Sequence, residues 1–415
     1  MKFPRILIGT TVLGVLAAIT TACGGGGGSS RFIQPINPPP PPTGTNYTTC
    51  TDNEGGSQLV PNWQSPLFIN NYQPAIQALI QHVSQASYAS HIGYIRIGLG
   101  RGGEINLPSG WNDQSQSNSV CYGGYSGKWK YSVGGTSAGS SSWNTYLSSM
   151  IIYEGALGSP KNLLVSITPV SGAGNVTDDF IAPVAVQNGL SYGNQGLEAS
   201  DITAFSSGGQ CGGDWCNLFK IAPPAIKELQ TIGQSCPQGA GACSGQQGET
   251  GPLPALLQFA TGQGSPVVPS PSNDLEIYYQ DWLIAFDPTN SDNGTYGAAY
   301  ASALEAASAH ATMQVLFPDP TNPDIQTYVL TQPSVAGVVI DVDWSDIQPS
   351  SSSFDWTITD NSIQQWIGAG AKKVNLVFQN TTYGGGNCQS TAVGSNGQSS
   401  SGNCAMPAWM WSVLQ

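Results

Sequence analysis

The chain has 415 residues, of which 40% are hydrophobic and only 9% are charged, and its formal net charge is −13. This length allows one large barrel domain or two smaller domains. The negative charge argues against nucleic acid as a partner, because phosphate binding needs a basic face, whereas a surface of uncharged polar residues suits neutral substrates such as sugars.

The N-terminal segment has the pattern of an export signal and takes no part in the fold. Lys2 and Arg5 are basic, and residues 6–19 form an apolar run that is short for a membrane span. Residues 20–23, Thr-Thr-Ala-Cys, resemble a bacterial lipobox in which Cys23 is lipidated, although Thr stands where Leu is usual. We therefore predict a signal peptide over residues 1–22 and a lipoprotein of the outer membrane. An ordinary signal peptide is the alternative.

A Gly run and a Pro run follow the lipidated cysteine. Residues 24–28 are all Gly, and residues 38–42 are all Pro. Such a segment is first flexible and then stiff, so residues 23–45 are predicted to be a tether between the membrane and a single domain over residues 46–415.

Beyond the tether, short apolar runs alternate with longer amphipathic stretches, a pattern typical of repeated βα units. Strands are predicted at residues 92–99, 163–167, 190–192, 226–232, 275–279, 313–317, 335–342 and 374–378. Helices are predicted at residues 72–86, 143–153, 178–187, 215–221, 253–260, 296–309, 324–330 and 362–369. The spacing of apolar residues from Leu275 to Phe286 also fits a helix. Eight such units are the content of one closed barrel, so the predicted fold class is α/β, a (β/α)8 TIM barrel.

Several segments resemble glycoside hydrolases of clan A, such as the family 42 β-galactosidases. Residues 335–349, VAGVVIDVDWSDIQP, followed by FDW at 354–356, are similar to the second-strand motif of that family. Residues 406–409, MPAW, resemble the segment after its third strand. Residues 92–104, IGYIRIGLGRGGE, resemble its fourth strand with the terminal acid. The resemblance covers most of residues 46–415 and implies a barrel that hydrolyses glycosides with retention of configuration.

The order of these segments differs from that of an ordinary family member. The strand that resembles strand four comes first, near residue 92, and those that resemble strands one to three come last. We therefore predict a circular permutation, in which residues 407–415 would continue in space into residues 46–63. Two truncated barrels are the alternative, and each would leave an open sheet with unpaired edges.

Glycoside hydrolysis needs two carboxyl groups that flank the scissile bond, one to protonate the leaving oxygen and one to attack the anomeric carbon or activate water. The resemblance implies Glu at the ends of strands four and seven. Glu104 closes the predicted strand four and is the candidate general acid/base, and Glu228, in strand seven, is the candidate nucleophile. Gly103 stands where the family has Asn, so an expected substrate contact is missing.

Each acid also has a plainer interpretation. Glu104 fits a solvated loop carboxylate, and Glu228 fits a structural carboxylate. Glu276, in strand eight, is the rival nucleophile and is otherwise expected to contact substrate.

Further substrate-binding candidates lie at predicted strand ends or within strands. Sugar sites combine carboxylates with aromatic platforms and with amide or guanidinium donors. The candidates are Arg96, Asn194, Gln195, Trp344 and Trp409. Packing in the core or at the rim is the alternative for both tryptophans, and pairing with a buried acid is the alternative for Arg96.

Without Cys23 eight cysteines remain, and an even number in an exported protein indicates disulfides. Local pairs would be 211–216, 236–243 and 388–404, which leaves 50–121, but the sequence does not fix the connectivity. The spacing does not fit zinc, and no metal or cofactor is predicted. The eight residues are Cys50, Cys121, Cys211, Cys216, Cys236, Cys243, Cys388 and Cys404.

The sequence thus favours a monomeric glycoside hydrolase that acts on a polysaccharide or oligosaccharide and reaches the membrane only through its lipid. A surface lipoprotein that binds glycans without cleaving them is the alternative. A serine hydrolase is disfavoured, because no strand leads into Gly135–Gly139 and no His is placed to serve it.

Overall fold

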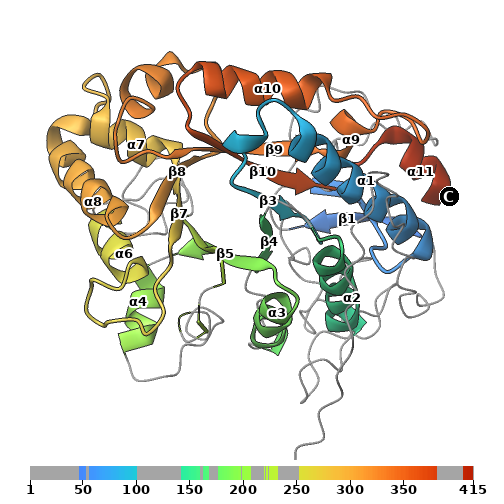
Figure 1. Cartoon of the computed structure of the whole chain (residues 1–415). Coiled ribbons are helices and arrows are strands. Elements are labelled where there is room, and N and C mark those ends of the chain that lie inside the picture. Colours follow the sequence, from blue (N-terminus) through green and yellow to red (C-terminus); the bar gives the residue numbers. More distant parts are fainter. Residues whose placement is uncertain are drawn as a thin grey trace, which may run out of the picture. The chain divides into compact units, whose positions relative to one another are not determined.

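The computed structural model describes residues 46–52, 56–100, 142–158, 162–167, 176–197, 199–206, 219, 221–222, 224–231, 252–380 and 405–414. Eight parallel strands form a closed barrel in the order β10-β3-β4-β5-β6-β7-β8-β9, and helices surround it (Figure 1). The strands follow one another around the barrel in chain order, so the predicted (β/α)8 TIM barrel is confirmed. No helix within the described ranges is long and apolar enough to cross a membrane.

Every strand of the barrel coincides with a strand predicted from the sequence. The segment with two interpretations, Leu275 to Phe286, contains both structures, because strand β7 ends at Tyr278 and helix α7 begins at Tyr279. The barrel strands are β3 (Tyr94–Ile97), β4 (Asn162–Ile167), β5 (Ser191–Leu197), β6 (Lys227–Thr231), β7 (Asp274–Tyr278), β8 (Thr312–Leu316), β9 (Gly337–Asp343) and β10 (Lys373–Gln379).

The predicted helices are also confirmed, except the one at residues 215–221, most of which lies outside the described residues. The larger helices are α1 (Pro66–Gln85), α2 (Ser142–Ala156), α3 (Val176–Gln187), α4 (Ala199–Ser206), α6 (Leu253–Ala260), α7 (Tyr279–Phe286), α8 (Ala298–Ser308), α10 (Thr357–Gly368) and α11 (Ala408–Leu414). Short turns of helix are η1 (Ala89–His91), η3 (Asn293–Gly297), η4 (Ile325–Val329) and α9 (Trp344–Ile347).

The two faces of each strand have different environments. Apolar side chains such as Ile95, Leu275 and Val338 belong to the large core cluster, which also includes the buried faces of the helices. The residues that alternate with them point into the barrel, because successive side chains of a strand face opposite ways. Most of these inward residues are polar, and only a small separate apolar cluster, formed around Leu316 and Val339, lies among them.

The two ends of the barrel domain meet at Asn46. Its Nδ2 donates to the carbonyl oxygen of Leu414 in α11 at 3.1 Å, and its Oδ1 accepts from the Oγ of Ser65 at 2.9 Å. Ser65 in turn caps α1, since its Oγ accepts from the backbone N–H of Leu67 at 3.3 Å. The chain therefore enters and leaves the barrel within one βα unit, between β10 and β3. The circular permutation requires this closeness, and it remains a proposal.

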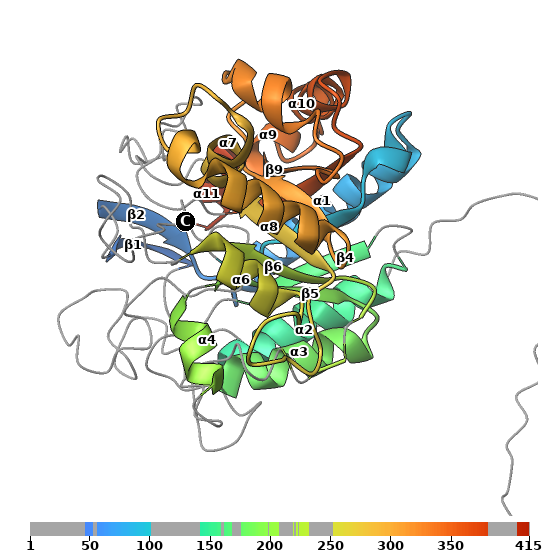
Figure 2. The same ribbon diagram turned by 90° about the vertical axis from the view of Figure 1, so that its left-hand side faces the viewer.

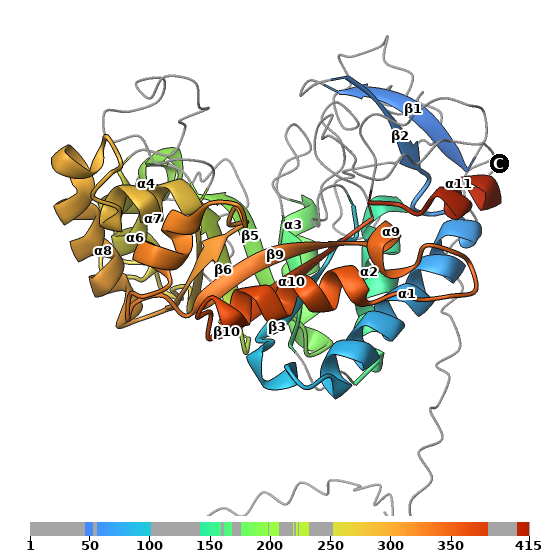
Figure 3. The same ribbon diagram turned by 90° about the horizontal axis from the view of Figure 1, so that it is seen from above.

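A two-stranded antiparallel sheet precedes α1. It consists of β1 (Tyr47–Asp52) and β2 (Gly56–Pro61) and was not predicted from the sequence. The hairpin lies beside the C-terminal helix α11, away from the strands of the barrel (Figures 2 and 3).

Candidate active site

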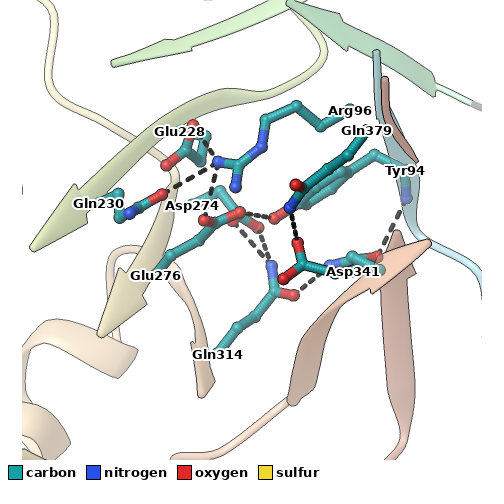
Figure 4. Close-up of polar contacts among 10 residues, drawn as sticks. Tyr94, Arg96, Glu228, Gln230, Asp274, Glu276, Gln314, Asp341 and Gln379 are labelled. Carbon is teal, nitrogen blue, oxygen red and sulfur yellow. Dashed lines mark hydrogen bonds and ion pairs between the residues drawn. The ribbon is translucent and has the colours of Figure 1, made fainter. Parts of the chain in front are cut away.

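Polar side chains from several strands converge inside the barrel (Figure 4). They occupy the inward positions of β3 and of β6 to β10. Hydrogen bonds and ion pairs join most of them, and Asp341 and Gln379 form a separate hydrogen-bonded pair. The labelled residues are Tyr94, Arg96, Glu228, Gln230, Asp274, Glu276, Gln314, Asp341 and Gln379. An ordinary barrel of this fold fills its interior mainly with branched apolar residues, so the polar interior marks this site as unusual.

Arg96 lies at the centre of this set. Its Nη1 donates to Oε1 of Gln230 and to Oε2 of Glu276, each at 3.1 Å, and it lies 3.8 Å from Oε2 of Glu228. The Arg96, Glu228 and Glu276 side chains are all 0% exposed. Arg96 therefore pairs with buried acids, as the alternative interpretation of the sequence held, and a buried charge needs such partners because desolvation is costly.

Tyr94, the first residue of β3, also contacts this cluster. Its hydroxyl donates to Oε1 of Glu276. Burial, together with the nearby Glu276 charge, raises the pKa of Tyr94 well above its ordinary value. The phenol consequently stays protonated and acts as a hydrogen-bond donor at every physiological pH.

At the N-terminal end of the strands, which we call the floor of the barrel, the inward side chains form hydrogen bonds with one another. Nε2 of Gln314 donates to both carboxyl oxygens of Asp274, at 2.7 and 2.8 Å, and Nδ2 of Asn375 donates to Oε1 of Gln314. Burial raises the pKa of Asp274 well above its ordinary value. A pocket of about 450 Å³ opens at this end of the strands, beside Thr312 and Lys373. Barrel enzymes keep their chemistry at the opposite end, so we assign these contacts to stability.

Near the C-terminal mouth of the barrel lies an aspartate that, unlike Glu228 and Glu276, is accessible to solvent. Asp341, in β9, is exposed by its accessible surface area, yet the protein atoms packed around its carboxyl group still desolvate it. Nε2 of Gln379 donates to its Oδ1. Burial raises the pKa of Asp341 to about 6, and the Arg96 charge and the Gln379 hydrogen bond oppose this rise. Asp343 follows two residues later, where burial, and then the nearby Asp341, raises its pKa to about 8.

Glu228, the candidate nucleophile, lies deep in the barrel. It is the second residue of β6 and is paired in register with Gly193 and Asp274. A Cβ atom at Gly193 would lie 1.8 Å from Oε2 of Glu228, so the carboxylate is packed against the bare backbone of β5. Glu276 lies one pleat nearer the mouth, in register with Gln230.

Glu104, the candidate acid/base, lies outside the described residues, but the start of its segment is described. The carbonyl oxygen of Gly98 accepts from the hydroxyl of Tyr72 at 2.6 Å and from Nδ2 of Asn380 at 2.8 Å. The carbonyl oxygen of Leu99 accepts from the hydroxyl of Tyr146 at 3.2 Å. The chain that leads to Glu104 is thus anchored at the C-terminal end of β3, at the mouth of the barrel.

The two candidate tryptophans pack against each other at 5.9 Å between ring centroids. Trp344 is 0% exposed and also packs against Phe68 and Tyr72, so this structure leaves it no free face for a sugar. Trp409 is partly buried, and its Nε1 donates to the carbonyl oxygen of Gln348 at 2.9 Å. Trp344 therefore has the core-packing role that was the alternative to sugar binding in the sequence analysis.

Asn194 is 0% exposed, and its carboxamide makes no hydrogen bond to any part of the chain that the structure describes. The side chain of Gln195 is not among the described groups. The same holds for Cys50, whose backbone belongs to β1, and the other cysteines, including Cys23, also lie outside the described residues. The disulfides and the lipidation site therefore stay predictions.

Sequence reasoning overlooked most of the interior set, although a signal was present. Polar residues recur at every second position within apolar strands, as in Asp274-Leu-Glu276 of β7 and Asn375-Leu-Val-Phe-Gln379 of β10. In strands buried on both faces, this alternation indicates a polar interior.

Comparisons with models of known families, with curated proteins and with solved structures find no match for this chain. Any assignment of function therefore depends on the site itself, because this fold hosts many unrelated activities.

Proposed function

We propose that the chain is a glycoside hydrolase that cleaves a polysaccharide or oligosaccharide at the C-terminal mouth of its barrel. The observation that carries the proposal is the set of carboxyl groups around Arg96, which extends through the barrel to the solvent-exposed Asp341. Glycoside hydrolysis needs two such groups in different protonation states. The mostly uncharged surface suits a neutral substrate, and the retaining outcome follows from the resemblance to clan A enzymes.

In this proposal Glu104 is the acid/base and Glu228 the nucleophile. Glu104 follows Gly98 and Leu99 in the sequence, and those two residues lie at the C-terminal end of β3, the end where substrates bind in barrel enzymes. Nη1 of Arg96 lies 3.8 Å from Oε2 of Glu228 and is the ion-pair partner of this carboxyl group. Against this assignment, Glu228 is fully buried, so a sugar would reach it only if the interior opened.

A panel of polysaccharides and aryl glycosides tests the proposal with the purified chain that lacks its signal peptide. Wild type should release reducing sugar or phenol from at least one member. Glu104→Gln should lower kcat/KM by roughly a hundredfold or more, because a general acid contributes about that factor. Glu305→Gln, at an exposed position of α8, is the matched control and should leave the rate unchanged. Wild type that cleaves no glycan on the panel would refute the proposal.

The non-catalytic alternative is favoured by one observation. The two described glutamates of the barrel wall, Glu228 and Glu276, are both held by one guanidinium nitrogen inside the barrel. Such an arrangement also suits a scaffold that binds glycans without cleaving them. Binding of glycans by wild type without turnover, unchanged by Glu104→Gln, would support this function.

The same proposal includes export as a lipoprotein anchored through Cys23. It is supported by the residues of the signal segment alone, and the structure describes none of them.

A further inference from the structure

One residue at the mouth of the barrel has an unusual backbone conformation. Phe317 directly follows β8, which ends at Leu316, and its φ angle is 41°. Among the described residues other than Gly, it alone has a φ angle in the left-handed region. A bulky side chain makes this region costly, and such outliers persist where the surrounding structure holds them, often at functional sites. Phe317 is therefore a candidate for a functional role.

The left-handed turn decides which way the Phe317 ring points. Val315 of β8 belongs to the core outside the strands, whereas Leu316 lies in the small apolar cluster inside the barrel. Since successive side chains of an extended strand face opposite ways, residue 317 would face the helices if β8 simply continued. Instead, Phe317 packs against the inner cluster, which also contains Val339 and Val377. The strained backbone thus turns the ring back into the barrel.

Inside the barrel the ring lies against the central cation of the polar set. The Cζ atom of Arg96 is 6.0 Å from the centroid of the Phe317 ring, within the range of a cation–π contact. Arg96 is the ion-pair partner of Glu228 and Glu276, and all three of these side chains are 0% exposed. Phe317 is half-buried and lies beyond the C-terminal end of its strand, whereas the two acids lie within theirs. The ring is therefore on the mouth side of the buried acids.

Two opposing effects act on this ring. Its contacts with Arg96 and with the inner cluster favour the inward position, and the backbone strain favours a return to an ordinary φ angle. An extended backbone at residue 317 would point the side chain toward the helices and away from Arg96. A ligand that binds better to the open form can therefore displace the ring from its inward position.

We propose that Phe317 is a gate residue, whose ring closes the polar interior and turns outward to admit a sugar to Glu228 and Glu276. This inference rests on the proposed glycosidase function, in which the nucleophile Glu228 is fully buried. It deepens that function by naming the group that the substrate displaces. A phenyl ring and a pyranose are both six-membered rings, so the space that Phe317 leaves takes one sugar unit beside Arg96.

Chemical labelling of carboxyl groups tests the closure without any turnover. A water-soluble carbodiimide couples glycine ethyl ester to accessible carboxyl groups of the exported chain, and mass spectrometry of its peptides gives the rate at each acid. In wild type, Glu228 and Glu276 should react roughly a hundredfold more slowly than Glu305, which is exposed in α8. Phe317→Gly removes the ring and accepts the left-handed φ angle, so the two buried acids should react roughly tenfold faster or more.

Controls separate an opened barrel from an unfolded one. Glu154 of α2 is 1% exposed and lies in the helical layer, so it should stay unlabelled in every folded variant. Phe317→Ala is the second variant, because it removes the ring and keeps the strain. Phe354→Ala, at an aromatic position that is 38% exposed and precedes α10, is the matched control and should keep the wild-type rates.

Two labelling results would overturn the gate. One is an equal rate at Glu228 and Glu276 in wild type and in both variants of Phe317. The other is faster labelling of these two acids only together with Glu154, since the ring would then stabilise the fold as a whole.

Substrate entry gives an independent readout. If the substrate must displace the ring, the apparent affinity of wild type is reduced by the fraction of chains that are open. Phe317→Ala should therefore raise kcat/KM by roughly tenfold on a glycoside that wild type cleaves, mainly through a lower KM. A residue needed only for packing would leave kcat/KM unchanged or lower it, and either result would refute the role in entry. If wild type cleaves no glycoside, the proposed function fails, whereas the labelling still decides whether Phe317 closes the barrel.

Discussion

The strongest test of the interior is the removal of its central cation by Arg96→Met. Nη1 of Arg96 contacts Glu276 at 3.1 Å and Glu228 at 3.8 Å, and all three side chains are 0% exposed. Removal of one partner from a buried ion pair typically costs ~3–5 kcal/mol, because the remaining charge stays buried. Methionine has a similar length and no charge, so the loss of packing is small. We expect the variant to lose ~3–5 kcal/mol of unfolding free energy at pH 7.

The same reasoning predicts recovery when the acids are also neutralised. Arg96→Met combined with Glu228→Gln and Glu276→Gln replaces the ionic cluster with neutral groups of similar shape, which is often neutral for stability. The triple variant should therefore be more stable than Arg96→Met, with an interaction energy of about 2 kcal/mol or more. Urea unfolding followed by tryptophan fluorescence measures each value. A loss below about 1 kcal/mol for Arg96→Met, or no recovery in the triple variant, would refute the electrostatic account of the interior.

Three further predictions concern a single position each. The pKa of Asp343 is raised from 3.8 to about 8, so this carboxyl group lowers the free energy of unfolding as the pH rises between those values. Asp343→Asn should therefore have an unfolding free energy ~1–2 kcal/mol above that of wild type at pH 7 and equal to it at pH 4. Urea unfolding at the two pH values measures this difference in unfolding free energy, and a difference that stays the same at both would contradict the prediction. Gly193→Ala puts a Cβ against Glu228 and should destabilise the fold by ~1–3 kcal/mol, and the unfolding midpoint should partly recover when Glu228→Ala makes room. Cys23→Ala should release the chain from the membrane fraction, and a variant that stays with the membranes on fractionation would argue against the lipid anchor.

The barrel was predictable because its strands have local signals. The strand residues Val338 to Ile340 and Val374 to Phe378 form runs rich in β-branched and aromatic side chains, which favour buried parallel strands. Helix α1 repeats Ile76, Ile80 and Val83 on one face. The hairpin β1–β2 escaped prediction because residues 47–61 are mostly polar and lack a clear apolar alternation.

The candidate site was less predictable, because its geometry depends on strand register. The sequence indicated that Arg96, Glu228 and Glu276 lie in barrel strands, but it did not indicate their depth. Depth follows from pairings such as Glu228 with Asp274 and Gln230 with Glu276, which only the folded sheet reveals. The same register places Asp341 near the C-terminal end of its strand, and no role was predicted for this residue from the sequence.

The polar interior is itself an argument that the barrel has a function beyond stability. An apolar filling would avoid the desolvation of Arg96 and its acids, and replacement of buried ion pairs by apolar residues is often neutral or stabilising. Natural proteins depart from such rules mainly at functional sites and offset the cost elsewhere. Here the burial of the large apolar core between the strands and the helices offsets the desolvation cost of the interior charges. The departure extends from the buried floor, at Asp274, to the exposed Asp341 at the mouth. Barrel enzymes act at the mouth, so the polar side chains connect the floor of the barrel to the end at which our proposal places the substrate.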